Sequence, residues 1–101
     1  MMITRIWHGR TKAADADAYL DYLRNTGLKD YAATLGNLSA KILRRIEGDT
    51  CHFYTITEWD SIDSIKAFAG EAYEKARYYE EDGHYLLELE EQVVHFETYN
   101  A

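Results

Sequence analysis

Proline is absent from this chain of 101 residues, and cysteine occurs only once, as Cys51. A single cysteine excludes a disulfide within the chain and favours a reducing, cytosolic setting. No stretch approaches the roughly 18 apolar residues that a membrane-spanning helix requires. Residues 1–8 are too few and too polar for a secretory signal peptide. Without proline, the turns must be made by glycine and asparagine.

Basic residues are also scarce. The chain has 11 Lys and Arg against 18 Asp and Glu, which gives a formal net charge of −7. Such a chain repels phosphate groups, which argues against nucleic acids and anionic membranes as partners. Hydrophobic residues make up 47%, enough for one small core, so we expect residues 1–101 to form a single domain. A domain of this size gains stability from a buried oligomer interface.

Two kinds of hydrophobic period alternate along the chain. Period-two alternation and β-branched or aromatic residues predict strands, whereas apolar residues at helical spacing predict helices. Gly48 and Asp49 predict a hairpin turn. The expected strands cover residues 3–8, 38–47, 51–59 and 91–99, and the expected helices or helical turns cover 13–23, 29–34, 62–69, 71–79 and 84–88.

The order of these elements predicts an α+β fold, a ferredoxin-like βαββαβ antiparallel sheet with helices on one face. A sheet covered on one face alone should alternate cleanly between apolar and polar residues. Here adjacent apolar or aromatic residues place such side chains on both faces. These pairs are Ile42 and Leu43, Phe53 and Tyr54, and Val93 and Val94. We therefore expect a second copy of the chain to cover the other face, so that the protein is a homodimer.

Four segments in this order resemble the antibiotic biosynthesis monooxygenase domain, and the resemblance spans nearly the whole chain. They are residues 6–12, 58–61, 65–70 and 78–82. The resemblance implies a dimeric α+β barrel with a pocket between each sheet and its helices. Some members of that family oxygenate aromatic polyketides without metal or flavin, others bind and open haem, and many have no assigned activity.

The haem-degrading branch of that family can be compared with this chain at the positions of its functional residues. Its members use an Asn on the first strand, a Trp on the second main helix and a His beyond that Trp. The corresponding positions here hold Ile6, Phe68 and Tyr78. The resemblance therefore implies no haem degradation, and we expect no cofactor.

His8 is the candidate catalytic residue, because it lies at the end of the first expected strand and an imidazole can take a proton near neutral pH. We expect the first and third strands to be central and parallel, which would place His8 beside a pocket lined by residues 68–79. The alternative is a histidine that only hydrogen-bonds locally. No spacing among His52, His84 and His95 matches a metal motif, so we expect no metal site.

Tyrosine is unusually abundant, with 9 residues. A cavity edged by rings and hydroxyls suits a flat phenol or quinone-like ligand. The candidate ligand-binding residues are Phe68, Arg77, Tyr78, Tyr79 and Tyr85. The alternatives are that the aromatic residues fill the core and that Arg77 pairs with a nearby acidic side chain.

The resulting prediction is a small-molecule pocket protein that resembles cofactor-independent monooxygenases and oxygenates an aromatic phenol or quinol. In that reaction His8 would take the phenolic proton, and Tyr78 and Tyr79 would orient the ligand. The alternative is a dimeric barrel that binds a ligand, or serves a structural role, without catalysis.

Overall fold

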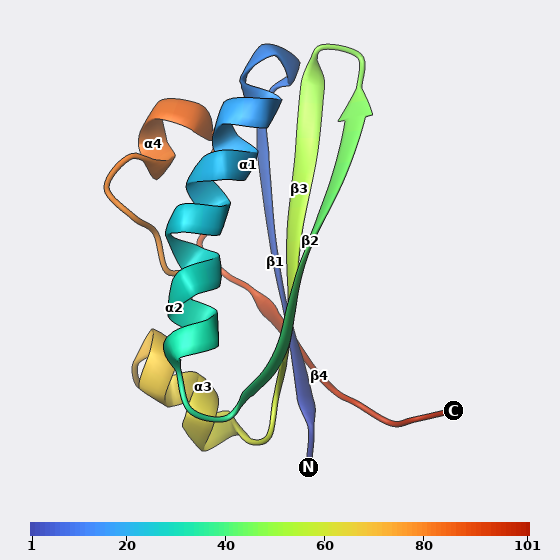
Figure 1. The fold of residues 1–101 in the computed structure, drawn as a ribbon, viewed down its shortest axis with the longest axis vertical. Coiled ribbons are helices and arrows are strands. Elements are labelled where there is room, and N and C mark those ends of the chain that lie inside the picture. Colours follow the sequence, from blue (N-terminus) through green and yellow to red (C-terminus); the bar gives the residue numbers. More distant parts are fainter.

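The computed structural model describes residues 1–101 and contains one four-stranded sheet with helices on a single side (Figure 1). The strands are β1 (Ile3–Lys12), β2 (Asn37–Glu47), β3 (Thr50–Trp59) and β4 (Val94–Glu97). The helices are the short 3-10 turn η1 (Ala13–Asp15), α1 (Ala16–Asn25), α2 (Gly27–Ala33), α3 (Ile62–Ala69) and α4 (Asp82–Tyr85). None of these helices is long and apolar enough to cross a membrane.

The strands are ordered β2-β3-β1-β4, and every neighbouring pair is antiparallel. This arrangement confirms the ferredoxin-like fold. The expectation that the first and third strands are parallel is wrong, because His8 of β1 lies opposite Tyr54 in an antiparallel β1–β3 ladder. The helical crossover from β1 brings the chain back parallel to it in β2. The hairpin at Gly48 then reverses the chain, so β3 must run against β1.

Alternate residues of the two central strands define two faces of the sheet. The covered face, which packs against the helices, carries Ile3, Arg5, Trp7, Gly9 and Thr11 of β1 and Cys51, Phe53, Thr55, Thr57 and Trp59 of β3, all of them buried. The open face carries Thr4, Ile6, His8, Arg10, His52, Tyr54, Ile56 and Glu58. Side chains of a strand alternate between faces, so neighbouring residues in the sequence enter different environments.

The core has two parts along the covered face. Trp7, Phe53 and Tyr19 belong to the first, beneath α1. Trp59 and Phe68 belong to the second, beneath α2 and α3. Both parts are rich in aromatic contacts, such as the edge-on Tyr19–Phe53 pair with ring centroids 5.1 Å apart.

Gly9 allows the first core part to form. A Cβ atom at this position would lie 2.5 Å from the Trp7 indole. The indole therefore lies directly against the backbone of its own strand, which a larger residue would prevent.

The segment between α3 and α4 differs from expectation. The helix predicted over residues 71–79 is absent, and α3 ends at Ala69, just before Gly70, whose φ is 88°. The segment instead pairs with the chain before β4, through hydrogen bonds from Ala76 N–H to Glu91 C=O (2.8 Å) and from Val93 N–H to Glu74 C=O (2.9 Å). Tertiary pairing has thus overridden a helical spacing of apolar residues. The regular part of the last strand is correspondingly shorter than predicted, and the last helical turn spans 82–85 rather than 84–88.

The open face exposes large apolar side chains on three strands. Leu43 of β2 is 48% exposed, Tyr54 of β3 36%, and Val94 and Phe96 of β4 55% and 50%. Their registers against β1 and β3 place all four on this face. The two-sided apolar pattern read from the sequence is therefore real, and its consequence for assembly stays a prediction.

Candidate functional site

A pocket lies between the covered face of the sheet and the helices. Its lining combines aromatic rings, hydroxyls and charged groups from β1, α1, α2, β3, the segment after α3 and the start of α4. The lining residues are Arg5, Trp7, Tyr19, Leu23, Gly27, Tyr31, Thr55, Arg77, Tyr78, Tyr79 and Asp82. The free volume is about 20 Å³, which holds about one water molecule. A larger ligand therefore requires lining side chains to move apart.

Arg5 is the most unusual lining residue, because it is a cation with only 2% of its surface exposed. It donates one hydrogen bond, from Nη2 to the carbonyl oxygen of Lys75 at 3.3 Å, and its buried Nε has no partner. No carboxylate forms an ion pair with it. Burial lowers the pKa of Arg5, and the nearby Arg77 charge adds to this, while Tyr31 opposes it.

Arg77 brings a second guanidinium to the same pocket. It pairs with Asp30 (Nη2 to Oδ2, 3.2 Å) and donates a hydrogen bond to the carbonyl oxygen of Phe68 (3.1 Å). Both guanidiniums lie over the Phe68 ring, at 5.4 Å for Arg5 and 4.9 Å for Arg77. Phe68, which belongs to the second core part, therefore forms a cation–π contact with each of the two guanidiniums.

Buried hydrogen bonds hold the opposite wall of the pocket. Asp82 is 4% exposed and accepts a hydrogen bond from the Tyr19 hydroxyl (2.8 Å) and another from the Tyr79 backbone N–H (2.6 Å). The Tyr79 hydroxyl donates to Asp30. Burial raises the pKa of both Tyr78 and Tyr79, and the Asp30 hydrogen bond raises that of Tyr79 further. These hydroxyls are thus donors and not phenolates at neutral pH.

The structure brings most of the predicted ligand-binding residues together. Arg77, Tyr78 and Tyr79 line the pocket, and Phe68 contacts both pocket arginines. Tyr85 does not line it; its ring packs against Tyr19 at a centroid distance of 5.5 Å, in the first core part.

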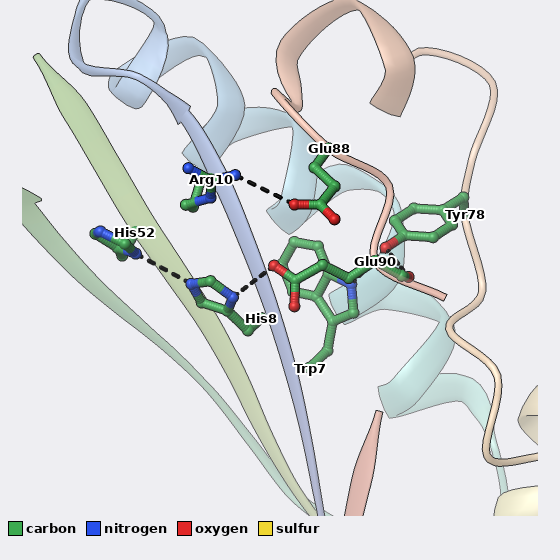
Figure 2. Close-up of polar contacts among 7 residues, drawn as sticks. All are labelled: Trp7, His8, Arg10, His52, Tyr78, Glu88 and Glu90. Carbon is green, nitrogen blue, oxygen red and sulfur yellow. Dashed lines mark hydrogen bonds and ion pairs between the residues drawn. The ribbon is translucent and has the colours of Figure 1, made fainter. Parts of the chain in front are cut away.

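His8 lies on the open face, away from the pocket. Its Nδ1 is 2.6 Å from a Glu90 carboxylate oxygen, and its Nε2 is 3.1 Å from Nδ1 of His52 (Figure 2). The expectation that His8 borders the pocket together with residues 68–79 is wrong. The physical reason is strand alternation: Trp7 lines the pocket, so the next side chain must point to the other face.

Residues 86–90 connect the two faces around the edge of β1. Leu87 N–H donates to Arg10 C=O (2.8 Å), and Arg10 pairs with Glu88 (3.2 Å). The Trp7 indole N–H donates to the Tyr78 hydroxyl (3.3 Å), which in turn donates to the Glu90 carbonyl. Figure 2 shows Glu90 between Tyr78 and His8. Since Tyr78 binds the Glu90 backbone and His8 its carboxylate, the contacts fix position without forming a continuous proton path.

Sequence reasoning missed Arg5 and Asp82. Arg5 had a visible signal: it stands between Ile3 and Trp7 at a position where alternation predicts a core residue. Asp82 had none, because it sits in an acidic stretch that resembles a solvated surface.

The residues of the pocket do not fit a haem group. None of its lining residues is a histidine, and its free volume is about 20 Å³. The Tyr78 hydroxyl, which could ligate iron only as a phenolate, is instead hydrogen-bonded to Trp7 and Glu90. The structure also contains no cluster of three or more His, Cys, Asp or Glu side chains suited to a metal ion.

Comparison with solved structures shows the same fold in proteins of low sequence identity. A protein from Nitrosomonas europaea assigned as an antibiotic biosynthesis monooxygenase has a TM-score of 0.67 at 15% identity, over 94% of this chain and 88% of that one. Rv0793 from Mycobacterium tuberculosis has a TM-score of 0.67 at 14% identity, and the match covers 100% of this chain and 98% of that one. The heme-degrading protein Rv3592 from the same organism, solved heme-free, has a TM-score of 0.60 at 16% identity, over 100% and 98%. No protein-family model and no curated protein matches the chain.

Proposed function

We propose that this protein binds a small, flat phenol or quinol in the pocket and oxygenates it with dioxygen, without a cofactor. The observation that carries the proposal is the pocket lining, in which Trp7, Tyr31, Tyr78 and Tyr79 surround two guanidinium groups. Rings and convergent polar groups are typical of sites for aromatic ligands. The fold shared with a protein assigned as a monooxygenase supports the choice of reaction.

The reaction needs no external reductant. A phenol and one dioxygen give a quinone and one water: the ring gains one oxygen atom and loses two hydrogens, which leave with the second oxygen. The ring supplies all four electrons that dioxygen accepts. The protein's part is to hold the ring, to exclude water and to stabilise the deprotonated phenol, which is the electron-rich form.

The pocket provides no free base for the phenolic proton. His8 lies on the other face, and both Asp82 oxygens already accept hydrogen bonds. This observation favours a second candidate, a ligand-binding protein without catalysis. In either case a ring enters only when side chains of the pocket lining move apart, because the free volume is about 20 Å³.

A second copy of the chain is the proposed partner of the open face. The exposed Leu43 and Tyr54 lie opposite each other there on β2 and β3, and Val94 and Phe96 lie on the same face on β4, across β1. A stable dimer buries roughly 800 Å² or more on each partner. Sheet-to-sheet pairing would also cover His8 and His52, which are only about one-quarter exposed.

The test of the enzymatic proposal is incubation with 1-naphthol under isotopically labelled dioxygen. Oxygenation would yield naphthoquinone with one labelled oxygen atom per molecule, together with labelled water. Binding of 1-naphthol by isothermal calorimetry without quinone formation would support the non-catalytic candidate. Absence of binding would contradict both. A parallel titration with hemin should give no saturable Soret shift at one site per chain.

A further inference from the structure

We infer that the pocket takes its aromatic ligand as an anion, with the ring oxygen of a phenolate held between Arg5 and Arg77. This inference rests on the proposed ligand site and goes beyond it by naming the charge state of the ligand and the residue that selects it.

The first observation is the unpaired charge of Arg5. Its side chain is almost fully buried, yet its polar neighbours are the neutral Lys75 carbonyl and Tyr31 hydroxyl, no carboxylate pairs with it, and its Nε is left without a partner. Burying a guanidinium without a counter-ion is costly, and buried polar atoms without hydrogen bonds are rare in native proteins. An anion in the adjacent pocket would supply both the counter-charge and an acceptor.

The second observation is the charge balance around this point. Arg77 also lines the pocket, and its single carboxylate partner, Asp30, is shared with the Tyr79 hydroxyl. Asp82 faces the pocket from the opposite wall, with both oxygens occupied by Tyr19 and Tyr79. Of the two guanidiniums, only Arg77 has an ion-paired carboxylate, and Asp82 forms an ion pair with neither of them.

The neighbours on the sheet add no negative charge. His95 lies directly opposite Arg5 on β4, and its buried Nε2 is likewise without a partner. On β3, the Thr55 hydroxyl bonds to Tyr31 (3.2 Å), so that these two groups satisfy each other. No carboxylate of the chain lies within ion-pair distance of Arg5, so a bound ligand is the proposed source of an anionic oxygen there.

A planar phenolate suits this arrangement better than a neutral phenol. A phenolate offers the guanidiniums a charge-assisted acceptor and a counter-charge, whereas a neutral phenol brings no counter-charge. The two guanidinium charges therefore lower the pKa of a bound phenol, and this effect must exceed that of burial, which raises it. The ligand would then lose its proton to solvent on binding, which explains how the pocket can lack a base.

The inference is tested by titrating 4-nitrophenol, whose phenolate form is coloured, into the protein over a range of pH. The bound phenol should ionise at lower pH than the free one, with phenolate preferred by about tenfold or more, one pKa unit. The neutral analogue 4-nitroanisole should bind no more tightly than the phenol at low pH. A bound pKa equal to the free value, in the unaltered protein, would overturn the inference.

The variant Arg5→Met separates ligand selection from folding. It removes the charge but keeps an apolar chain of similar length, so the preference for phenolate should fall by about tenfold. The free protein should unfold at the same or a higher urea concentration, because an unpaired buried charge has been removed. A purely structural Arg5 would instead give a less stable protein with unchanged preference. Arg10→Met on the open face of the same strand is the matched control and should change neither.

The outcomes distinguish this inference from the proposed function. Labelled quinone from 1-naphthol with no shift in the ionisation of 4-nitrophenol would retain oxygenation and reject the anionic site. A shifted ionisation that depends on Arg5, without quinone formation, would retain the anionic site and reject oxygenation. If Arg5→Met fails to fold, the pH titration of the unaltered protein still decides the matter, and Arg77→Met provides the second charge removal.

Discussion

The two faces of the sheet use the same strands in opposite ways. On the covered face, Phe53 and Trp59 are fully buried and Arg5 is 2% exposed. On the open face, Tyr54 is 36% exposed, although it is the next residue after Phe53. Adjacent residues of one strand thus differ in burial, because their side chains point to opposite faces of the sheet and the helices cover only one of these faces.

Polar groups differ between the faces as well. On the covered face they are held by internal partners, as in the Tyr19–Asp82 bond, or left unpaired, as at Arg5 Nε. On the open face, His8 and His52 bond to each other, and water can reach both. A charge on the covered face therefore carries a cost that a ligand can relieve, whereas a charge on the open face is already hydrated.

The largest expected difference between the faces is in core packing. Phe53→Ala should lower the free energy of unfolding by about 3–5 kcal/mol, because it leaves a cavity beneath α1. Tyr54→Ala should cost under about 1 kcal/mol in the monomer, since most surface substitutions have small effects. Urea denaturation at low protein concentration measures both. Where Phe53→Ala does not fold, Phe53→Leu should still lower the free energy of unfolding more than Tyr54→Ala does. Equal losses at the two positions would contradict the assignment of faces.

The next effect concerns assembly. The unaltered protein should have a mass near twice 11.7 kDa by light scattering at micromolar concentration. Leu43→Lys should shift the protein to the single-chain mass, because an unpaired charge would be buried between apolar sheets. Lys29→Glu, an exposed change on α2, is the control and should leave the dimer intact. A single-chain mass for the unaltered protein would reject pairing through the open face.

A smaller effect compares the pocket wall with the strand edge. Asp82→Ala leaves the buried Tyr19 hydroxyl without its acceptor and should cost about 1–3 kcal/mol of stability. Glu88→Ala removes the exposed Arg10 pair and should cost about 0–1 kcal/mol. The double variant with Tyr19→Phe should recover part of the Asp82 loss in chemical denaturation. Additive losses would show that the two side chains do not act together.

The last expected effect is a pH dependence from His95, which is absent at neutral pH. Burial, and then the charge of Arg5, lower the pKa of His95 to about 4 from 6.5. Between these pH values the unfolded chain binds a proton that the folded chain does not, so stability falls as the pH falls through this window. His95→Gln should flatten that dependence, measured by the urea midpoint, while the exposed His84→Gln should not.

Arg5→Met tests the contribution of the Arg5 charge to this pH dependence. Because that charge lowers the pKa of His95, its removal should raise the pKa, which NMR titration measures. An unchanged His95 titration in that variant would show that the two groups do not interact across β1 and β4.

The sequence alone determined the elements that depend on local pattern. Alternation predicted all four strands, although β1 runs to Lys12 instead of ending at residue 8, so His8 lies within the strand and not at its end. Helical spacing predicted the helices before β2, and Gly48 with Asp49 predicted the hairpin. The order of elements predicted the ferredoxin-like fold, and the doubled apolar positions, such as Phe53 and Tyr54, predicted an apolar open face. These features follow from short-range geometry, which each segment carries in its own residues.

Only the tertiary structure decided which side of each strand the helices cover. That choice placed Trp7 in the pocket and His8 outside it, although both lie on one strand. It also placed Arg5 beside the pocket, and pairing with the chain before β4 removed the helix expected over residues 71–79. The physical reason is that burial and long-range pairing depend on partners that are distant in the sequence. The residues of one segment alone therefore do not determine them.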